Sequence, residues 1–145
     1  MANYTCATRT NYFHVKDADA FRELMSRVYC SEDNVSLWEE PKNNEMLFAF
    51  GCYGSICGLR NADADEYDDG DEDTYDAFVE ELQKCIADGD AVLIYLAGHE
   101  KLRYVTGTVT IITSTDYRVV DMDAAGTAMA KEMLGNPGFQ TRTSY

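Results

Sequence analysis

The sequence predicts an α+β fold, in which helices cover one face of a largely antiparallel sheet. Its 145 residues, of which 46% are hydrophobic and only two are proline, suit one globular domain with a substantial core. Stretches with the alternation of half-buried strands are interrupted by three stretches with the spacing of amphipathic helices. Two pairs of strands have short connections, which favours an antiparallel arrangement.

The first predicted strand, residues 4–15, is rich in threonine and aromatic side chains. Asp17 or Asp19 can cap the helix that follows. Positions i, i+3, i+4 and i+7 of that helix are apolar and form its expected buried face: Phe21, Leu24, Met25 and Val28.

Two further strands, residues 35–40 and 46–53, are joined by the sequence Pro-Lys-Asn-Asn at 41–44, which indicates a hairpin. The glycine-rich segment 51–58 comes next, and we expect its centre to form a turn. Its spacing matches no phosphate-binding loop, so it predicts no nucleotide site.

The second predicted helix spans residues 75–88, with Asp73 or Thr74 as its cap and Gly89 at its end. Its expected buried face consists of Phe78, Val79, Leu82, Cys85 and Ile86.

Two β-rich segments, 91–97 and 103–113, follow the second helix and predict a hairpin that turns at His99. A strand at 117–122 then precedes a helix at 123–134, which Gly135 and Pro137 end.

The first six of these elements have the order β-α-β-β-α-β, which is typical of a two-layer, ferredoxin-like sandwich. The last three would form an additional C-terminal β-β-α extension. We expect a single α+β domain over residues 1–137 and a mobile tail at 138–145. Because this fold supports many unrelated functions, it predicts none by itself.

The chain has 26 acidic and 12 basic residues, which gives a formal charge of -14. Nucleic acid and anionic membrane surfaces would repel such a protein, so neither is an expected partner. No apolar run approaches the ~20 residues that cross a bilayer. The first fifteen residues lack the pattern of a secretory signal, and we therefore expect a cytoplasmic protein.

The negative charge is concentrated between residues 63 and 90, where thirteen acidic residues accompany one base, Lys84. Duplex DNA carries about one charge per 1.7 Å, and a carboxylate-rich surface can imitate it toward a basic groove. A solvated loop that binds nothing is the structural alternative. The expected partner-binding residues include two tyrosines that suit interface anchors: Asp63, Asp65, Glu66, Tyr67, Asp68, Asp69, Asp71, Glu72, Asp73, Tyr75, Asp76, Glu80 and Glu81.

The alternative function is a calcium-binding or regulatory protein-interaction module that uses the same acidic loop. Aligning Gly70 with the glycine of an EF-hand loop places several carboxylates at ligand positions. The third position is Tyr67 and the twelfth is Asp76 where glutamate is expected, so we assign no metal site and no cofactor.

Five cysteines form an odd set without a Cys-x-x-Cys pair, so they indicate small apolar residues in a reducing compartment. His14 and His99 are expected to have structural roles in a strand and a turn, and no catalytic residue is predicted. The cysteines are Cys6, Cys30, Cys52, Cys57 and Cys85.

Three stretches carry a resemblance: TRTNYFHVKD at 8–17, FGCYGSI at 50–56 and AGHEKLRY at 97–104. In them the chain resembles a family of small, acidic, largely uncharacterised proteins encoded on bacterial mobile elements. Proteins of this kind include antirestriction proteins and anti-CRISPR inhibitors, some of which mimic DNA. By analogy the resemblance implies a non-enzymatic inhibitor of a basic, nucleic-acid-binding host defence protein, such as a nuclease.

Overall fold

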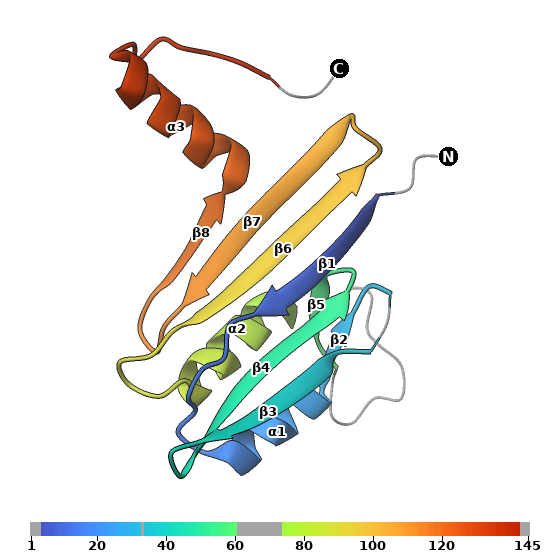
Figure 1. Ribbon diagram of the computed structural model, residues 1–145. Coiled ribbons are helices and arrows are strands. Elements are labelled where there is room, and N and C mark those ends of the chain that lie inside the picture. The colour runs from blue at the N-terminus through green and yellow to red at the C-terminus, as the bar shows by residue number, and fades with distance from the viewer. Residues whose placement is uncertain (1–3, 33, 61–73, 143–145) are drawn as a thin grey trace.

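A computed structural model describes residues 4–32, 34–60 and 74–142 of the chain. It contains a six-stranded sheet with the order β3-β4-β1-β6-β7-β8, and every neighbouring pair is antiparallel (Figure 1). The expected α+β class with a mainly antiparallel sheet is therefore confirmed. The strands are β1 (Thr5–Thr10), β3 (Ser36–Lys42), β4 (Glu45–Tyr53), β6 (Val92–Glu100), β7 (Tyr104–Ile112) and β8 (Tyr117–Asp121).

Two helices, α1 (Ala18–Ser26) and α2 (Thr74–Cys85), lie on one face of the sheet (Figure 1). A short antiparallel ribbon of β2 (Val28–Cys30) and β5 (Ile56–Leu59) lies beside α2. The apolar side chains predicted for both helices pack between these elements and the sheet, with Cys85 only partly buried. Val28, which was predicted to lie on the first helix, belongs instead to β2. Five phenylalanines without solvent exposure form the centre of this core: Phe13, Phe21, Phe48, Phe50 and Phe78.

Aspartate side chains begin α1 and the last helix, α3 (Met122–Leu134). The Asp17 carboxylate accepts hydrogen bonds from the backbone N–H groups of Asp19 and Ala20, which confirms Asp17 as the cap. Asp121 caps α3 in the same way, and Gly135 ends it with a left-handed backbone.

The predicted hairpin at 41–44 is also confirmed. Asn43 and Asn44 both have positive φ, 52° and 66°, and they connect β3 to β4 as a two-residue turn whose twist matches that of the strands.

The first predicted strand was too long, because β1 ends at Thr10. Beyond it the side chain of Asn11 replaces backbone pairing: its amide donates to the Ala91 carbonyl at 3.1 Å and accepts from Leu93 N–H at 2.8 Å. The chain then continues irregularly, with single bridges at Phe13 and Val15.

The second helix was also predicted too long, because it ends at Cys85 and not at residue 88. The Cys85 carbonyl accepts the N–H of Lys16, and the Ala87 N–H donates to the His14 carbonyl, so these backbone groups bond to another segment instead of continuing the helix. Gly89, with a φ of 85°, lies in the turn that follows.

His99 was wrongly placed in a turn. It lies within β6 opposite Val105, and residues 101–103 make the connection, with Lys101 at a φ of 50°. The glycine-rich segment turns at its centre, as predicted, because β4 continues to Tyr53, Gly54 has a φ of 88°, and β5 begins at Ile56.

Strand β8 forms one edge of the sheet, and helix α3 extends from it away from the rest of the molecule (Figure 1). Strand β8 pairs with β7, and α3 contacts mainly β7 and β8. No residue of α3 is buried. None of the described helices combines the length and apolar character needed to cross a membrane.

Candidate interaction surfaces

Most of the predicted partner-binding residues fall outside the described part of the chain. These are Asp63, Asp65, Glu66, Tyr67, Asp68, Asp69, Asp71, Glu72 and Asp73. The structure places the other four, Tyr75, Asp76, Glu80 and Glu81, on helix α2.

Asp76 and Glu80 are exposed and lie four residues apart on α2, so their carboxylates share one side of the helix. Neither forms an ion pair with a described residue. Glu81 instead accepts from the Lys84 ammonium at 2.9 Å, and this hydrogen bond raises the pKa of Lys84. Asp76 and Glu80 are therefore available to a basic partner.

Tyr75 has a different position from these carboxylates. Its ring packs against Phe78 with 6.1 Å between centroids, and burial raises the pKa of its phenol, whose hydroxyl bonds to Thr110. The side chain thus links α2 to the sheet.

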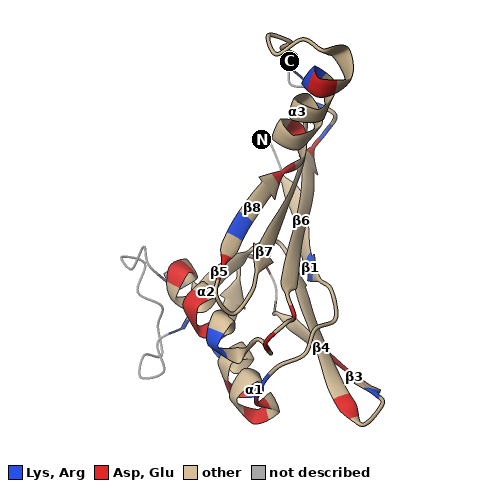
Figure 2. Cartoon of the chain, turned by 90° about the vertical axis from the view of Figure 1, so that its left-hand side faces the viewer, with Lys and Arg blue, Asp and Glu red and all other residues tan. Residues whose placement is uncertain are grey.

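The charge is divided unequally along the chain. Residues 91–145 contain five acidic and five basic residues, so the entire charge of -14 belongs to residues 1–90. Acidic residues lie on α1, on α2 and in β3, whereas β6 and β7 carry few charges (Figure 2). We call residues 1–90 the acidic half of the protein and residues 91–145 the neutral half.

The sheet face opposite α1 and α2 carries aromatic side chains, a surface that was not predicted from the sequence. The Arg9 guanidinium lies 4.2 Å from the ring centre of Trp38 and 5.8 Å from that of Tyr12. Tyr53 and Tyr95 are exposed on the same face. In the sequence, only the alternation of Thr5, Ala7 and Arg9 along β1 indicates that these side chains share one exposed face.

A shallow apolar groove of about 690 Å³ occupies the end of this face near the β6–β7 connection. We call it the sheet-end groove. Its lining includes Tyr53, Ala97, Leu102, Val105, Gly107 and Met122. Met122 is also the first residue of α3, so the groove and the protruding helix adjoin.

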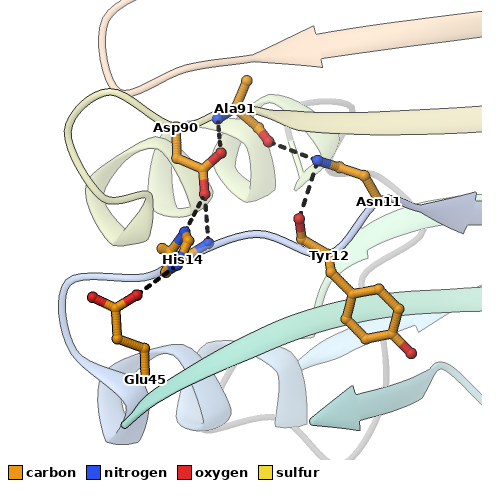
Figure 3. A network of polar contacts seen from close by, with 6 residues as sticks. All are labelled: Asn11, Tyr12, His14, Glu45, Asp90 and Ala91. Atoms are coloured by element: carbon orange, nitrogen blue, oxygen red, sulfur yellow. Dashed lines mark hydrogen bonds and ion pairs between the residues drawn. The ribbon is translucent and has the colours of Figure 1, made fainter. Parts of the chain in front are cut away.

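His14 is held between two carboxylates (Figure 3). Its Nδ1 lies 2.9 Å from Asp90 Oδ2, and its Nε2 lies 2.9 Å from Glu45 Oε2. The hydrogen bond to Asp90 is the main cause of the raised pKa of His14, with further contributions from both carboxylate charges. Both ring nitrogens are positioned to donate, so the geometry favours an imidazolium and not a free general base. The ring links the segment after β1 to the start of β4 and to the residues before β6.

Asp90 also accepts the backbone N–H groups of His14 at 2.7 Å and Ala91 at 2.8 Å. Burial acts to raise the pKa of Asp90, but these backbone bonds and the His14 ring outweigh it and lower that pKa. The carboxylate therefore fixes the segment after β1 to the start of β6.

The cysteines occupy partly buried positions and form no disulfide. Burial, together with a hydrogen bond to Cys30, raises the pKa of Cys52 to about 12, which disfavours a reactive thiolate. Among the residues that the structure describes, no three histidine, cysteine or acidic side chains are grouped as a metal site would require.

No protein-family model matches this chain, and comparisons with curated proteins and with solved structures find no significant similarity. The resemblance to mobile-element proteins thus stays a prediction.

Proposed function

We propose that this protein is a non-enzymatic inhibitor that binds a basic, nucleic-acid-binding protein through the acidic side of its helix layer. The observation that carries the proposal is the confinement of the whole net charge to residues 1–90. A negative surface of this kind attracts a groove built for phosphate and steers the two proteins together.

The described carboxylates support this proposal. Asp76 and Glu80 are exposed on α2 without an ion pair in the described chain, and residues 61–73 directly before them contain eight acidic residues and no basic one. Charge concentrated in this way destabilises a folded chain by self-repulsion, which a partner's lysines and arginines would relieve. By the analogy with mobile-element inhibitors, we propose a host defence nuclease as the partner.

The acidic surface is tested by affinity capture from bacterial lysate, with and without excess duplex DNA as competitor. The native protein is compared with the variant Asp76→Asn/Glu80→Gln, extended by Asp69→Asn and Asp71→Asn. A matched control, Glu100→Gln/Asp116→Asn/Asp123→Asn/Glu132→Gln, removes the same number of charges from the neutral half.

We expect nucleic-acid-binding proteins to be retained by the native protein and by the control, to be displaced by DNA, and to be lost from the acidic variant. Retention should also weaken as salt rises. Equal retention by all three proteins, or retention that DNA does not affect, would refute DNA mimicry.

We also propose that β1, α1, β3, β4, α2 and β6 form a ferredoxin-like core, with β2 and β5 as insertions and β7, β8 and α3 as the C-terminal extension. The strand order β3-β4-β1-β6, antiparallel throughout, and the position of both helices on one face support this topology. An experimental structure with a different strand order would refute it.

A further inference from the structure

Helix α3 carries an apolar surface that the described chain leaves uncovered. Met122, Met129 and Met133 follow each other at i, i+7 and i+11, which places them along one side of the helix. We call this side the methionine face. The three side chains are 53%, 64% and 87% exposed, so water contacts most of each.

A helix in this situation has little to stabilise it. Helices shorter than about 12–15 residues are marginal in water on their own, and most helical stability in proteins comes from packing an apolar face. Helix α3 has 13 residues and good caps, but none of its residues is buried. The methionine face is therefore expected to pack against another surface in solution.

The sheet-end groove is an apolar surface of matching character on the same chain. Leu102 is 83% exposed and Val105 is 53% exposed at its rim. The Met122 sulfur lies 3.3 Å from the position that a Cβ of Gly107 would occupy. Because Gly107 has no side chain, the first turn of α3 packs directly on β7. The remainder of the methionine face, Met129 and Met133, does not line the groove.

The charge distribution indicates which partner fits these two surfaces. A molecule with a charge of -14 repels its own copies, except where the local charge is balanced. Helix α3 and most of the groove belong to residues 91–145, which have no net charge. A partner recognised by charge would instead bind the acidic half.

We propose that a second copy of this chain covers the methionine face, with α3 of each protomer lying in the sheet-end groove of the other. Since Met122 belongs to both surfaces, a two-fold axis near it brings both pairs together at once, as a closed, isologous dimer requires. Flexible methionine side chains adapt well to a shallow groove. The acidic halves then point away from the axis and stay free.

The first test is the mass of the native protein in solution, measured by sedimentation equilibrium between 1 and 200 µM. We expect a reversible monomer–dimer equilibrium. Because salt screens the remaining repulsion between two acidic chains, the dimer should be at least as stable in 0.5 M as in 0.1 M salt. A monomer over the whole range, or a dimer that salt dissociates, would overturn the proposal.

Variants then test the two surfaces. Met129→Glu/Met133→Glu should weaken dimerisation at least about a hundredfold, because each substituted side chain occurs twice in a two-fold interface. Ala128→Glu adds a charge to an exposed position away from the methionine face and should leave the dimer intact. Circular dichroism checks that each monomer is folded, and a folded double variant that still dimerises would overturn the proposal.

Mixing two variants distinguishes helix-in-groove packing from contact between two helices. Leu102→Lys alters only the groove and Met133→Glu only the helix, so each alone should be monomeric. A mixture should form heterodimers. The native helix of the Leu102→Lys variant then lies in the native groove of the Met133→Glu variant, and in the other pair the glutamate introduced at position 133 faces the lysine introduced at position 102. Failure of the mixture to associate would exclude this packing. The acidic variant of the capture experiment changes no residue of α3 or of the sheet-end groove, so the two proposals fail independently.

Discussion

Replacing Asp90 by alanine should destabilise the protein by about 3 kcal/mol, far more than replacing its counterpart Glu45. The Asp90 carboxylate accepts three hydrogen bonds, from His14 N–H, the His14 ring and Ala91 N–H, at 2.7–2.9 Å. Net contributions of bonds to charged groups are about 1.5–3 kcal/mol each, and partial exposure and non-additivity reduce the sum. Glu45 makes a single exposed pair, worth no more than about 1 kcal/mol.

Thermal unfolding measures this difference. For a chain of this length, about 3 kcal/mol corresponds to a fall in Tm of roughly 10 °C, whereas Glu45→Ala should lower Tm by only a few degrees. Equal effects of the two substitutions would refute the assignment of Asp90 as the centre of the network.

The pH dependence of the Asp90→Ala effect provides a second readout. The pKa of Asp90 is lowered in the folded protein, so its contribution is present above the unfolded value and is lost as pH falls through the folded one. The pKa of His14 is raised, so the ring's contribution is complete below about pH 6.5 and is lost as pH rises through the folded value. The difference in stability between native and variant proteins should peak in mildly acidic solution. A difference independent of pH would contradict this account.

Three further outcomes are expected. Cys52 should react with iodoacetamide at pH 8 about a thousandfold more slowly than an unperturbed thiol, because its pKa is about 12, and peptide mass spectrometry would reveal a fast reaction that contradicts its burial. In urea unfolding, Gly54→Ala should destabilise the protein more than Gly89→Ala. Both glycines have positive φ, but a Cβ at Gly54 would stand 2.3 Å from Ser31 Oγ, whereas a Cβ at Gly89 would meet nothing within 4 Å. Equal losses of stability would show that φ alone matters. Phe50→Ala should cost about 3–5 kcal/mol by the same measurement, because the ring is fully buried between Phe13 and Phe78, and a loss below about 1 kcal/mol would refute that packing.

Local signals made much of the fold predictable. The apolar spacing of the first two helices, the caps Asp17 and Gly135, and the asparagine turn at 43–44 each depend on a few neighbouring residues. The ribbon of β2 and β5 escaped prediction because strands of three and four residues show no periodicity, and only their pairing defines them.

The aromatic side chains on the sheet face opposite α1 and α2 could not be predicted either, and the reason is different. Arg9 and Trp38 meet across β4, where Gly51 lies opposite Arg9 and leaves room for the indole ring at 3.3 Å from the missing Cβ. That contact depends on the register of three strands. The acidic surface, in contrast, was visible from composition, although composition alone did not show that Tyr75 packs against the core.

The central position of β1 has a consequence for how the chain folds during synthesis. One edge of β1 pairs with β4, but the other pairs with β6, where Thr5 lies opposite His99. Until residue 100 has emerged from the ribosome, β1 has an unpaired edge that other chains can reach. At about 5–20 residues per second this exposure lasts several seconds. When the complete chain refolds, pairing across such a sequence separation is slow, so β1–β6 contact should limit the rate of folding, and the β6–β7–β8 meander should form earlier.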